Sequence, residues 1–264
     1  MSVGLFVIGY SRPKYLEQCL SSLEANGWGG ASYRGVILDY KDNATAAANR
    51  AVVDRFQVDY VYSGIANEGV AKTKNRALKK MMEHGCEHLF LMEDDIVMQD
   101  PNTCTKYHIY ANMFGMHHAN FAHHGPANVG REKTYMLKPG PLTCYPNCVG
   151  AFSYYSRQCI EKVGYIDEAF MNAWEHVEHT YRIIKEGMHP PFWYFIDYPA
   201  SKKLLAEIPG SIDNSSIRPR ADWNENIQKG QEYWIKKHGE WIPDFPHEDW
   251  SNITSTFYAQ KPRP

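Results

Sequence analysis

Short, largely apolar runs alternate with helical patterns over the first hundred residues. The apolar runs are followed by polar loops and predict buried strands over 3–8, 35–39, 58–62 and 88–92. Between these runs, apolar residues recur every three or four positions, which predicts helices over 15–23, 43–56 and 69–84. Pro13 suits the first turn of the first helix, and Ser11 is its expected cap. The alternation predicts an α/β fold with a mostly parallel sheet and helices on both faces.

The second part of the chain has a less regular pattern. We expect helices near 102–116, 157–163, 174–186 and 222–237. We also expect a strand over 143–155 with a bend at Pro146, and an aromatic strand over 192–196. The Gly- and His-rich stretch 114–131 predicts a loop. No repeat or clear linker divides the chain, so the pattern favours one compact domain.

Four polar loops follow the predicted parallel strands, at 10–12, 39–43, 63–69 and 93–95. In open parallel sheets the ligand crevice lies at the carboxyl ends of the strands. We therefore expect these loops to meet at one edge of the sheet and to form the binding site.

Composition and charge narrow the class of protein. The 264 residues are 44% hydrophobic and 22% charged, with a formal charge of −2, as in ordinary globular proteins. The near-neutral balance disfavours nucleic acid as a partner. No apolar run approaches the roughly 18 residues of a membrane-spanning helix, and no signal sequence is apparent. The six scattered cysteines form no CxxC pattern and predict reduced thiols in a cytoplasmic protein.

An acidic triplet, Glu93-Asp94-Asp95, directly follows the apolar run 88–92. Adjacent carboxylates repel one another, and a divalent cation such as Mg²⁺ or Mn²⁺ would offset that repulsion while leaving sites for phosphate oxygens. A solvated acidic turn is the alternative. Further metal ligands could come from the loop 116–124, although a polar loop over the site is the simpler interpretation of its histidines, His117, His118, His123 and His124.

Several motifs, taken in order, resemble family 2 glycosyltransferases of the GT-A fold. Residues 6–16 read FVIGYSRPKYL, like the family's opening strand and helix, and the second strand ends in acidic residues within 36–42. Residues 67–78, NEGVAKTKNRAL, are similar to the family's N-x-G-x-x-x-x-R-N-x-A-L helix start, and residues 89–97 to its DxD strand. Three stretches resemble the acceptor segment that ends in a Glu-Asp pair: 149–157, 163–170 and 174–182.

The resemblance implies the Rossmann-like GT-A fold, with a mostly parallel sheet flanked by helices and a mixed acceptor-side half. It implies a nucleotide-sugar-binding half over 1–100, and an acceptor-binding half with a C-terminal helix over 101–264. The implied donor-binding residues are Tyr10, Arg12, Asp39, Asp42, Asn67, Gly69, Lys74 and Asp94. The implied ligands of Mn²⁺ or Mg²⁺ are Glu93 and Asp95, with a late histidine (His176, His189 or His247) to complete the shell.

Three positions depart from the family pattern. Lys74 stands where the family has an Arg, Glu93 where it has an Asp, and His176 where it has the Asp that acts as base. A neutral imidazole can accept a proton from a sugar hydroxyl, so His176 and its neighbour Glu175 are both candidates for the catalytic base. An ion pair between Glu178 and Arg182 on the same helix is expected as well.

The resemblance implies a metal-dependent transfer of a sugar from a nucleotide-diphosphate donor, a UDP-sugar first of all, to an acceptor hydroxyl with inversion. Arg218 and Arg220 lie in a polar loop that either closes over the donor diphosphate or is simply solvated. One alternative is a non-catalytic relative that binds glycans or nucleotides. Another is a nucleotidyltransferase, which would need a Gly-rich phosphate loop that residues 10–13 lack.

Overall fold

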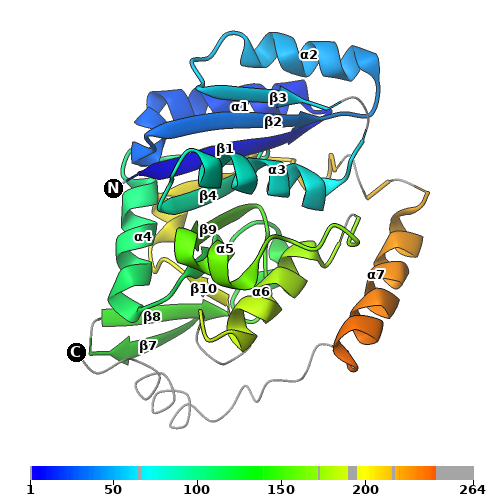
Figure 1. Ribbon diagram of the computed structural model, residues 1–264. Helices are drawn as coiled ribbons and strands as arrows, with labels where there is room; N and C mark the ends of the chain where they lie inside the picture. Colours follow the sequence, from blue (N-terminus) through cyan, green and yellow to red (C-terminus); the bar gives the residue numbers. More distant parts are fainter. Residues whose placement is uncertain are drawn as a thin grey trace.

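A central sheet of six strands organises the molecule (Figure 1). The computed structural model describes residues 2–64, 67–138, 140–171, 173–189, 195–215, 218–219 and 221–241. The strand order is β3-β2-β1-β4-β9-β6. The strands are β1 (Val3–Tyr10), β2 (Tyr33–Asp39), β3 (Tyr60–Ser63), β4 (His88–Glu93), β9 (Phe152–Ser156) and β6 (His118–Asn120). The first four are parallel, and β9 runs antiparallel to both β4 and β6.

The described residues also form two smaller sheets. One has the order β10-β8-β7, formed by β10 (Phe195–Asp197), β8 (Gly140–Tyr145) and β7 (Lys133–Leu137). The other pairs β11 (Leu205–Glu207) with β5 (Ile96–Met98). Because β9 pairs with β4, and β11 with β5, the two parts of the chain share their sheets.

Helices cover both faces of the central sheet because β1 buries side chains in both directions. Leu5 and Val7 join the core cluster that contains residues of α1 (Pro13–Ala25), α2 (Asn43–Val53) and α4 (Thr103–Phe114). Phe6 and Ile8 join the opposite cluster, with residues of α3 (Val70–Glu83), α5 (Arg157–Val163) and α6 (Glu175–Lys185). The helix α7 (Trp223–His238) contributes Trp234 to a third cluster with α6. The predicted α/β class is confirmed.

The register of the parallel strands sets their carboxyl ends side by side. Tyr10 of β1 lies opposite Asp39 of β2, and Ile8 of β1 lies opposite Glu93 of β4. The loops predicted to form one edge therefore do leave the sheet together.

Several local predictions were wrong. The predicted strand 143–155 is two strands, β8 and β9, which belong to different sheets because the chain turns away over 146–151. The stretch 114–131 contains β6 and a short 3₁₀ turn, Pro126–Asn128, rather than loop alone. Ser11 does not cap α1: it has a φ of 50°, and its hydroxyl accepts a hydrogen bond from the backbone N–H of Lys41 at 2.7 Å. Of the predicted strand 192–196, residues 192–194 lie outside the described residues.

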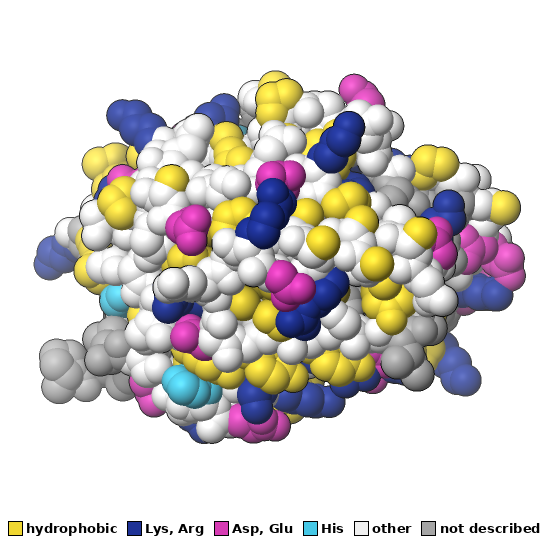
Figure 2. Space-filling view, turned by 90° about the horizontal axis from the view of Figure 1, so that it is seen from above, with side chains coloured by type: hydrophobic (Ala, Val, Ile, Leu, Met, Phe, Trp, Pro, Cys, Tyr) yellow, Lys and Arg dark blue, Asp and Glu magenta, His cyan; other side chains and the backbone are white. Residues whose placement is uncertain are grey.

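The surface and the thiols agree with the composition. Figure 2 shows basic and acidic side chains interspersed on the described part of the face seen from above. All six cysteines are free. In the described residues no helix has the length and apolar character needed to cross a bilayer.

Buried neutral histidines make the fold sensitive to acid. His179 on α6 is fully buried, and its Nε2 donates to the carbonyl oxygen of Gly164 at 2.9 Å. Burial, and then the positive charge of Arg182, lower the pKa of His179 to about 3. An unfolded histidine has a pKa of about 6.5. The stability contributed by neutral His179 is therefore complete above pH 6.5 and is lost as the pH falls towards 3.

We predict that His179→Gln, which retains an N–H donor, flattens this pH dependence. Between pH 7.5 and 5.5 the free energy of unfolding of the natural protein should fall by about 1 kcal/mol more than that of the variant. Urea unfolding at the two pH values measures the difference. Comparison with the variant cancels other groups such as Asp197, whose burial raises its pKa to about 7. Equal pH dependence in both proteins would contradict the prediction.

Candidate active site

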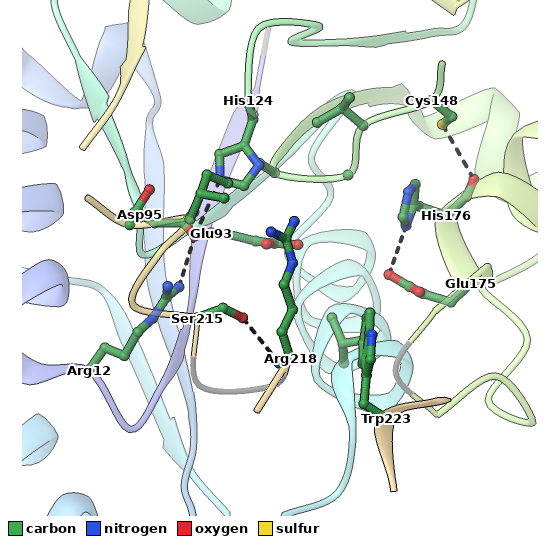
Figure 3. A pocket seen from close by; sticks show the side chains of 16 residues that line it. Arg12, Glu93, Asp95, His124, Cys148, Glu175, His176, Ser215, Arg218 and Trp223 are labelled. Atoms are coloured by element: carbon green, nitrogen blue, oxygen red, sulfur yellow. Dashed lines mark hydrogen bonds and ion pairs between the residues drawn. The ribbon is translucent and has the colours of Figure 1, made fainter. Parts of the chain in front are cut away.

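A cavity of about 290 Å³ lies at the carboxyl ends of β1 and β4 (Figure 3). The last residue of β4 contributes Glu93, and the loops after β1 and β4 contribute Arg12 and Asp95. The start of α6 contributes Glu175 and His176 from the opposite wall. The remaining lining residues are Val70, His124, Cys148, Val149, Gly150, Ala151, Ser211, Ile212, Ser215, Arg218 and Trp223.

The acidic edge of β4 is balanced by Arg12. The guanidinium of Arg12 forms an ion pair with Asp94 and lies 3.0 Å from Asp95 Oδ2. Asp94 also accepts the backbone N–H of Tyr10 at 3.1 Å. Burial raises the pKa of Asp94, with the nearby charge of Asp95 acting in the same direction. Asp94 therefore anchors the loop after β1, and does not line the cavity.

The side chains of Asp95 and His124 contact each other at this edge of the sheet. Burial would raise the pKa of Asp95, but His124 and Arg12 lower it overall. His124 Nε2 lies 3.3 Å from Asp95 Oδ2, and burial opposes the rise in the pKa of His124 that Asp95 causes. Asp95 Oδ1 is buried and has no hydrogen-bond partner within the part of the chain that is described. This oxygen and the imidazole of His124 are thus two candidate ligands beside one cavity.

The donor set fits a divalent ion that is shared with a ligand. Among the described residues no group of three or more His, Cys, Asp or Glu side chains is arranged to hold a metal. Mg²⁺-type sites, however, are often held by only one or two carboxylates together with substrate phosphates and water. Asp95 supplies such a carboxylate with the imidazole of His124 beside it, whereas the predicted ligand Glu93 is paired with Lys74.

The predicted histidine ligands are otherwise elsewhere. The ring of His117 contacts Ser156, that of His123 contacts Tyr145, and His118 is buried beneath the site against Thr180. His189 is buried near His118 and does not line the cavity. His247 lies outside the described residues.

Glu175 and His176 form a hydrogen-bonded pair. His176 Nδ1 lies 3.0 Å from Glu175 Oε1, and Glu175 Oε2 is buried with no partner among the residues described. Burial opposes ionisation of Glu175, but His176 and Lys74 lower its pKa well below the usual range. The ring of His176 packs on Gly150, where an added Cβ would lie 2.8 Å from it. The carboxylate is therefore ionised and fixes the imidazole at the cavity wall.

Lys74 lies behind this pair. Its ammonium contacts Glu93 Oε1 at 2.8 Å, Glu175 Oε1 at 3.3 Å and the carbonyl oxygen of Gly150 at 3.2 Å. It is buried and does not line the cavity. This geometry differs from the expectation that Lys74 faces the base or diphosphate of a donor.

The other expected donor residues organise loops beside the cavity. The carboxylate of Asp39 accepts three backbone N–H groups, from Tyr40 at 3.0 Å, Glu68 at 3.0 Å and Gly69 at 3.2 Å. Asp42 caps α2 through a reciprocal pair of hydrogen bonds with Thr45. Both aspartates therefore bind backbone N–H groups, and neither lines the cavity.

Asn67 and Gly69 shape the start of α3. Asn67 Nδ2 donates to the hydroxyl of Tyr10 at 3.2 Å, and Asn67 Oδ1 accepts the N–H of Gly69. Gly69 has a φ of 87°, which favours glycine, and a Cβ there would lie 3.1 Å from the carbonyl oxygen of Met171. Tyr10, Asn67 and Gly69 therefore lie at the expected edge of the sheet, outside the cavity itself.

Residues before and at the start of α7 line one side of the cavity, and most of them were not predicted as site residues from the sequence. Arg218, expected either to close over a diphosphate or to be solvated, lines the cavity. Its backbone N–H donates to Ser215 Oγ at 3.2 Å. Ile212 had no signal, because an isolated apolar residue in a polar loop resembles any surface residue. Trp223 was expected only as part of the helix 222–237, and it is the first residue of α7. Arg220 lies outside the described residues.

Comparison with known proteins identifies the class of protein that this sequence and fold resemble. No family model matches the chain. An uncharacterised glycosyltransferase, R363, of Acanthamoeba polyphaga mimivirus is 24% identical over 209 residues, which are 76% of this chain and 78% of the relative. The match in sequence is thus to a glycosyltransferase.

Solved structures agree on the fold. The mannosyltransferase PcManGT from Pyrobaculum calidifontis, in complex with GDP-Man and Mn²⁺, superposes with a TM-score of 0.58 at 14% identity, covering 97% of this chain and 73% of that one. S. aureus TarS residues 1–349 gives a TM-score of 0.55 at 12% identity, covering 98% and 71%. GalNAc-T7, with UDP, GalNAc and Mn²⁺, gives 0.55 at 9% identity, covering 98% and 54%. The predicted resemblance to GT-A glycosyltransferases, and the GT-A fold itself, are confirmed.

We predict that Asp39→Asn loosens the loop before α3. An amide keeps only one acceptor oxygen and presents N–H groups to backbone donors, so the variant should lose about 1–3 kcal/mol of stability. Asp42→Asn is the matched control, because asparagine is an equally good helix cap and should change stability by less than about 0.5 kcal/mol. Urea unfolding gives both values, and hydrogen exchange should locate the loosening at residues 67–69. Equal losses in the two variants would refute the assignment.

Proposed function

We propose that this protein is a glycosyltransferase that moves a sugar from a nucleotide-diphosphate donor to an acceptor hydroxyl, with a divalent metal ion and with inversion. The observation that carries the proposal is one cavity in a GT-A fold with Asp95 and His124 on one side and the Glu175–His176 pair on the other. The likeness to glycosyltransferases supports it, as do neighbours in complex with UDP, UDP-GlcNAc and GDP-Man. A UDP-sugar is the donor we would test first, and the free thiols favour the cytoplasm.

Binding of the donor diphosphate is assigned to the acidic edge and its neighbours. Asp95 and His124 would hold Mn²⁺ or Mg²⁺, with the diphosphate supplying further oxygen ligands. When bound, the ion would neutralise the charge that develops on the leaving nucleoside diphosphate. Arg218 lines the same cavity, and its guanidinium is suited to phosphate oxygens. Arg12 would pair with Asp94 and so hold the loop after β1 in place.

Deprotonation of the acceptor is assigned to His176. With Nδ1–H donated to the ionised carboxylate of Glu175, the neutral imidazole has Nε2 available to accept a proton. The carboxylate also stabilises the imidazolium that forms. Figure 3 places His176 and Asp95 on opposite sides of the cavity. An acceptor activated at His176 would therefore attack the anomeric carbon from the side opposite the leaving group, which inverts its configuration.

A non-catalytic relative is the second candidate, and one observation favours it. Arg12 pairs with both Asp94 and Asp95, so the acidic edge is balanced without a metal ion. Such a protein would bind nucleotide with the same affinity with and without Mn²⁺, and would neither hydrolyse nor transfer the sugar. A nucleotidyltransferase finds no support, because the compared proteins are glycosyltransferases.

We predict that Asp95→Ala abolishes metal-dependent donor binding and lowers sugar transfer by roughly 100-fold or more, because the leaving diphosphate loses its counter-charge. Calorimetry with UDP-sugars and GDP-sugars, with and without Mn²⁺, measures binding, and release of nucleoside diphosphate measures turnover. Asp54→Ala is the control, since Asp54 forms an exposed pair with Arg50 on α2 and should leave both quantities unchanged. Undiminished transfer by folded Asp95→Ala would count against the proposal.

We predict that His176→Asn separates binding from chemistry. The amide of asparagine can replace Nδ1–H towards Glu175 but cannot accept a proton, so transfer should fall about 100- to 10,000-fold. The Mn²⁺-dependent affinity for the donor should change less than about twofold, because the residue acts on the acceptor. Glu175→Gln provides the comparison for the other base candidate. If His176→Asn keeps its activity and Glu175→Gln loses it, Glu175 is the base.

A further inference from the structure

A continuous chain of charged contacts joins the donor edge to the base. Glu93, at the end of β4, contacts the ammonium of Lys74 at 2.8 Å, and Lys74 contacts Glu175 at 3.3 Å. Glu175 in turn binds His176 Nδ1 at 3.0 Å through the same oxygen, Oε1. These contacts therefore connect the first half of the protein to the second through Lys74 of α3.

The contacts of the Lys74 ammonium leave none of its N–H groups available to bind a substrate. Its side chain is 3% exposed, and its three acceptors, Glu93, Glu175 and the carbonyl of Gly150, match the three N–H donors of an ammonium. Burial opposes its charge, but the two carboxylates raise its pKa, so the ammonium stays protonated. A lysine held in this way can orient its partners and has no donor left for a ligand.

Gly150 lies against both Lys74 and His176, at the end of this series of contacts. A Cβ at this position would lie 2.8 Å from the ring of His176 and 3.1 Å from Lys74 Nζ. The imidazole and the ammonium are thus both pressed against the same stretch of bare backbone. Movement of Lys74 would release Glu175, and with it the ring of His176.

The chain also contains every departure from the family pattern that the sequence displays. Lys74, Glu93 and His176 replace an Arg, an Asp and an Asp, and they are linked to one another through Glu175. The carboxylate of Glu93 reaches the buried ammonium from the end of β4, at 2.8 Å. Lys74, Glu93 and His176 therefore belong to one connected set of contacts through Glu175.

We propose that Lys74 is a positioning residue: through Glu175 it holds His176 in the orientation for accepting a proton, and through Glu93 it ties that orientation to the donor edge. This inference rests on the proposed glycosyltransferase function. It gives Glu93 the role of holding Lys74, and leaves Asp95 and His124 as the residues that face a metal ion.

The test is a double-mutant cycle between Lys74 and His176, which both contact Glu175 and both lie against Gly150. Lys74→Met should lower kcat for transfer about 10- to 100-fold, as loss of a supporting contact does, with the donor Kd and KM changed less than about threefold. Lys74→Met combined with His176→Asn should be no slower than His176→Asn alone, because the base is then already absent. Lys74→Arg, which keeps the charge, should recover part of kcat. Lys72→Met, at an exposed position on the same helix, is the matched control and should behave as the natural protein.

Other outcomes identify which claim fails. A loss of donor affinity with kcat unchanged would mean that Lys74 binds the donor, and losses that multiply in the double variant would mean that it acts independently of His176; either overturns the positioning role alone. A natural protein that neither binds nucleotide-sugars with Mn²⁺ nor turns them over overturns the proposed function and this inference with it. If Lys74→Met does not fold, Lys74→Gln, which keeps N–H donors towards Gly150 and Glu175, carries the same comparison.

Discussion

Burial of acidic side chains at the end of β4 is the constraint around which the cavity is built. A carboxylate taken out of water is costly unless a cation and hydrogen bonds accompany it. Here the compensating groups come from separate elements: the cations Arg12 after β1 and Lys74 on α3, and the imidazole of His124 after β6. Each brings its own element to the carboxyl edge of the sheet. The loops and helices that carry these groups therefore meet where the carboxylates at the end of β4 are buried.

The elements with strong local signals were predicted well. Leu16, Cys19, Leu20 and Leu23 recur at helical spacing and are the buried face of α1, and the apolar run 88–92 is β4. The acidic triplet that contains Glu93 and Asp95 was found because it directly follows the apolar run of β4, whereas Glu175 and His176 were identified from the resemblance to the family's Glu-Asp pair. All four side chains line the same cavity.

Features that depend on distant pairing were not predictable. The strands β6 and β11 have three residues each and exist through pairing with β9 and β5, which no local pattern reveals. His124 reaches Asp95 because β6 and the turn after it are held by Asp197, which accepts the N–H of Ala122 at 2.9 Å. Lys74 was identified from its motif, but its partners Glu93 and Glu175 could not be inferred, since they lie on elements far apart in the sequence.

The antiparallel strand β9 has a consequence for building hybrid enzymes. It belongs to the second part of the chain but pairs along β4 from Met92 to His88, and its far side carries β6. A chimera that exchanges everything after residue 100 would therefore replace the last two strands at one side of the central sheet, β9 and the edge strand β6. Grafts that retain residues 118–120 and 152–156, and exchange only the segment preceding α7, would alter one wall of the cavity while leaving the hydrogen-bonded scaffold whole.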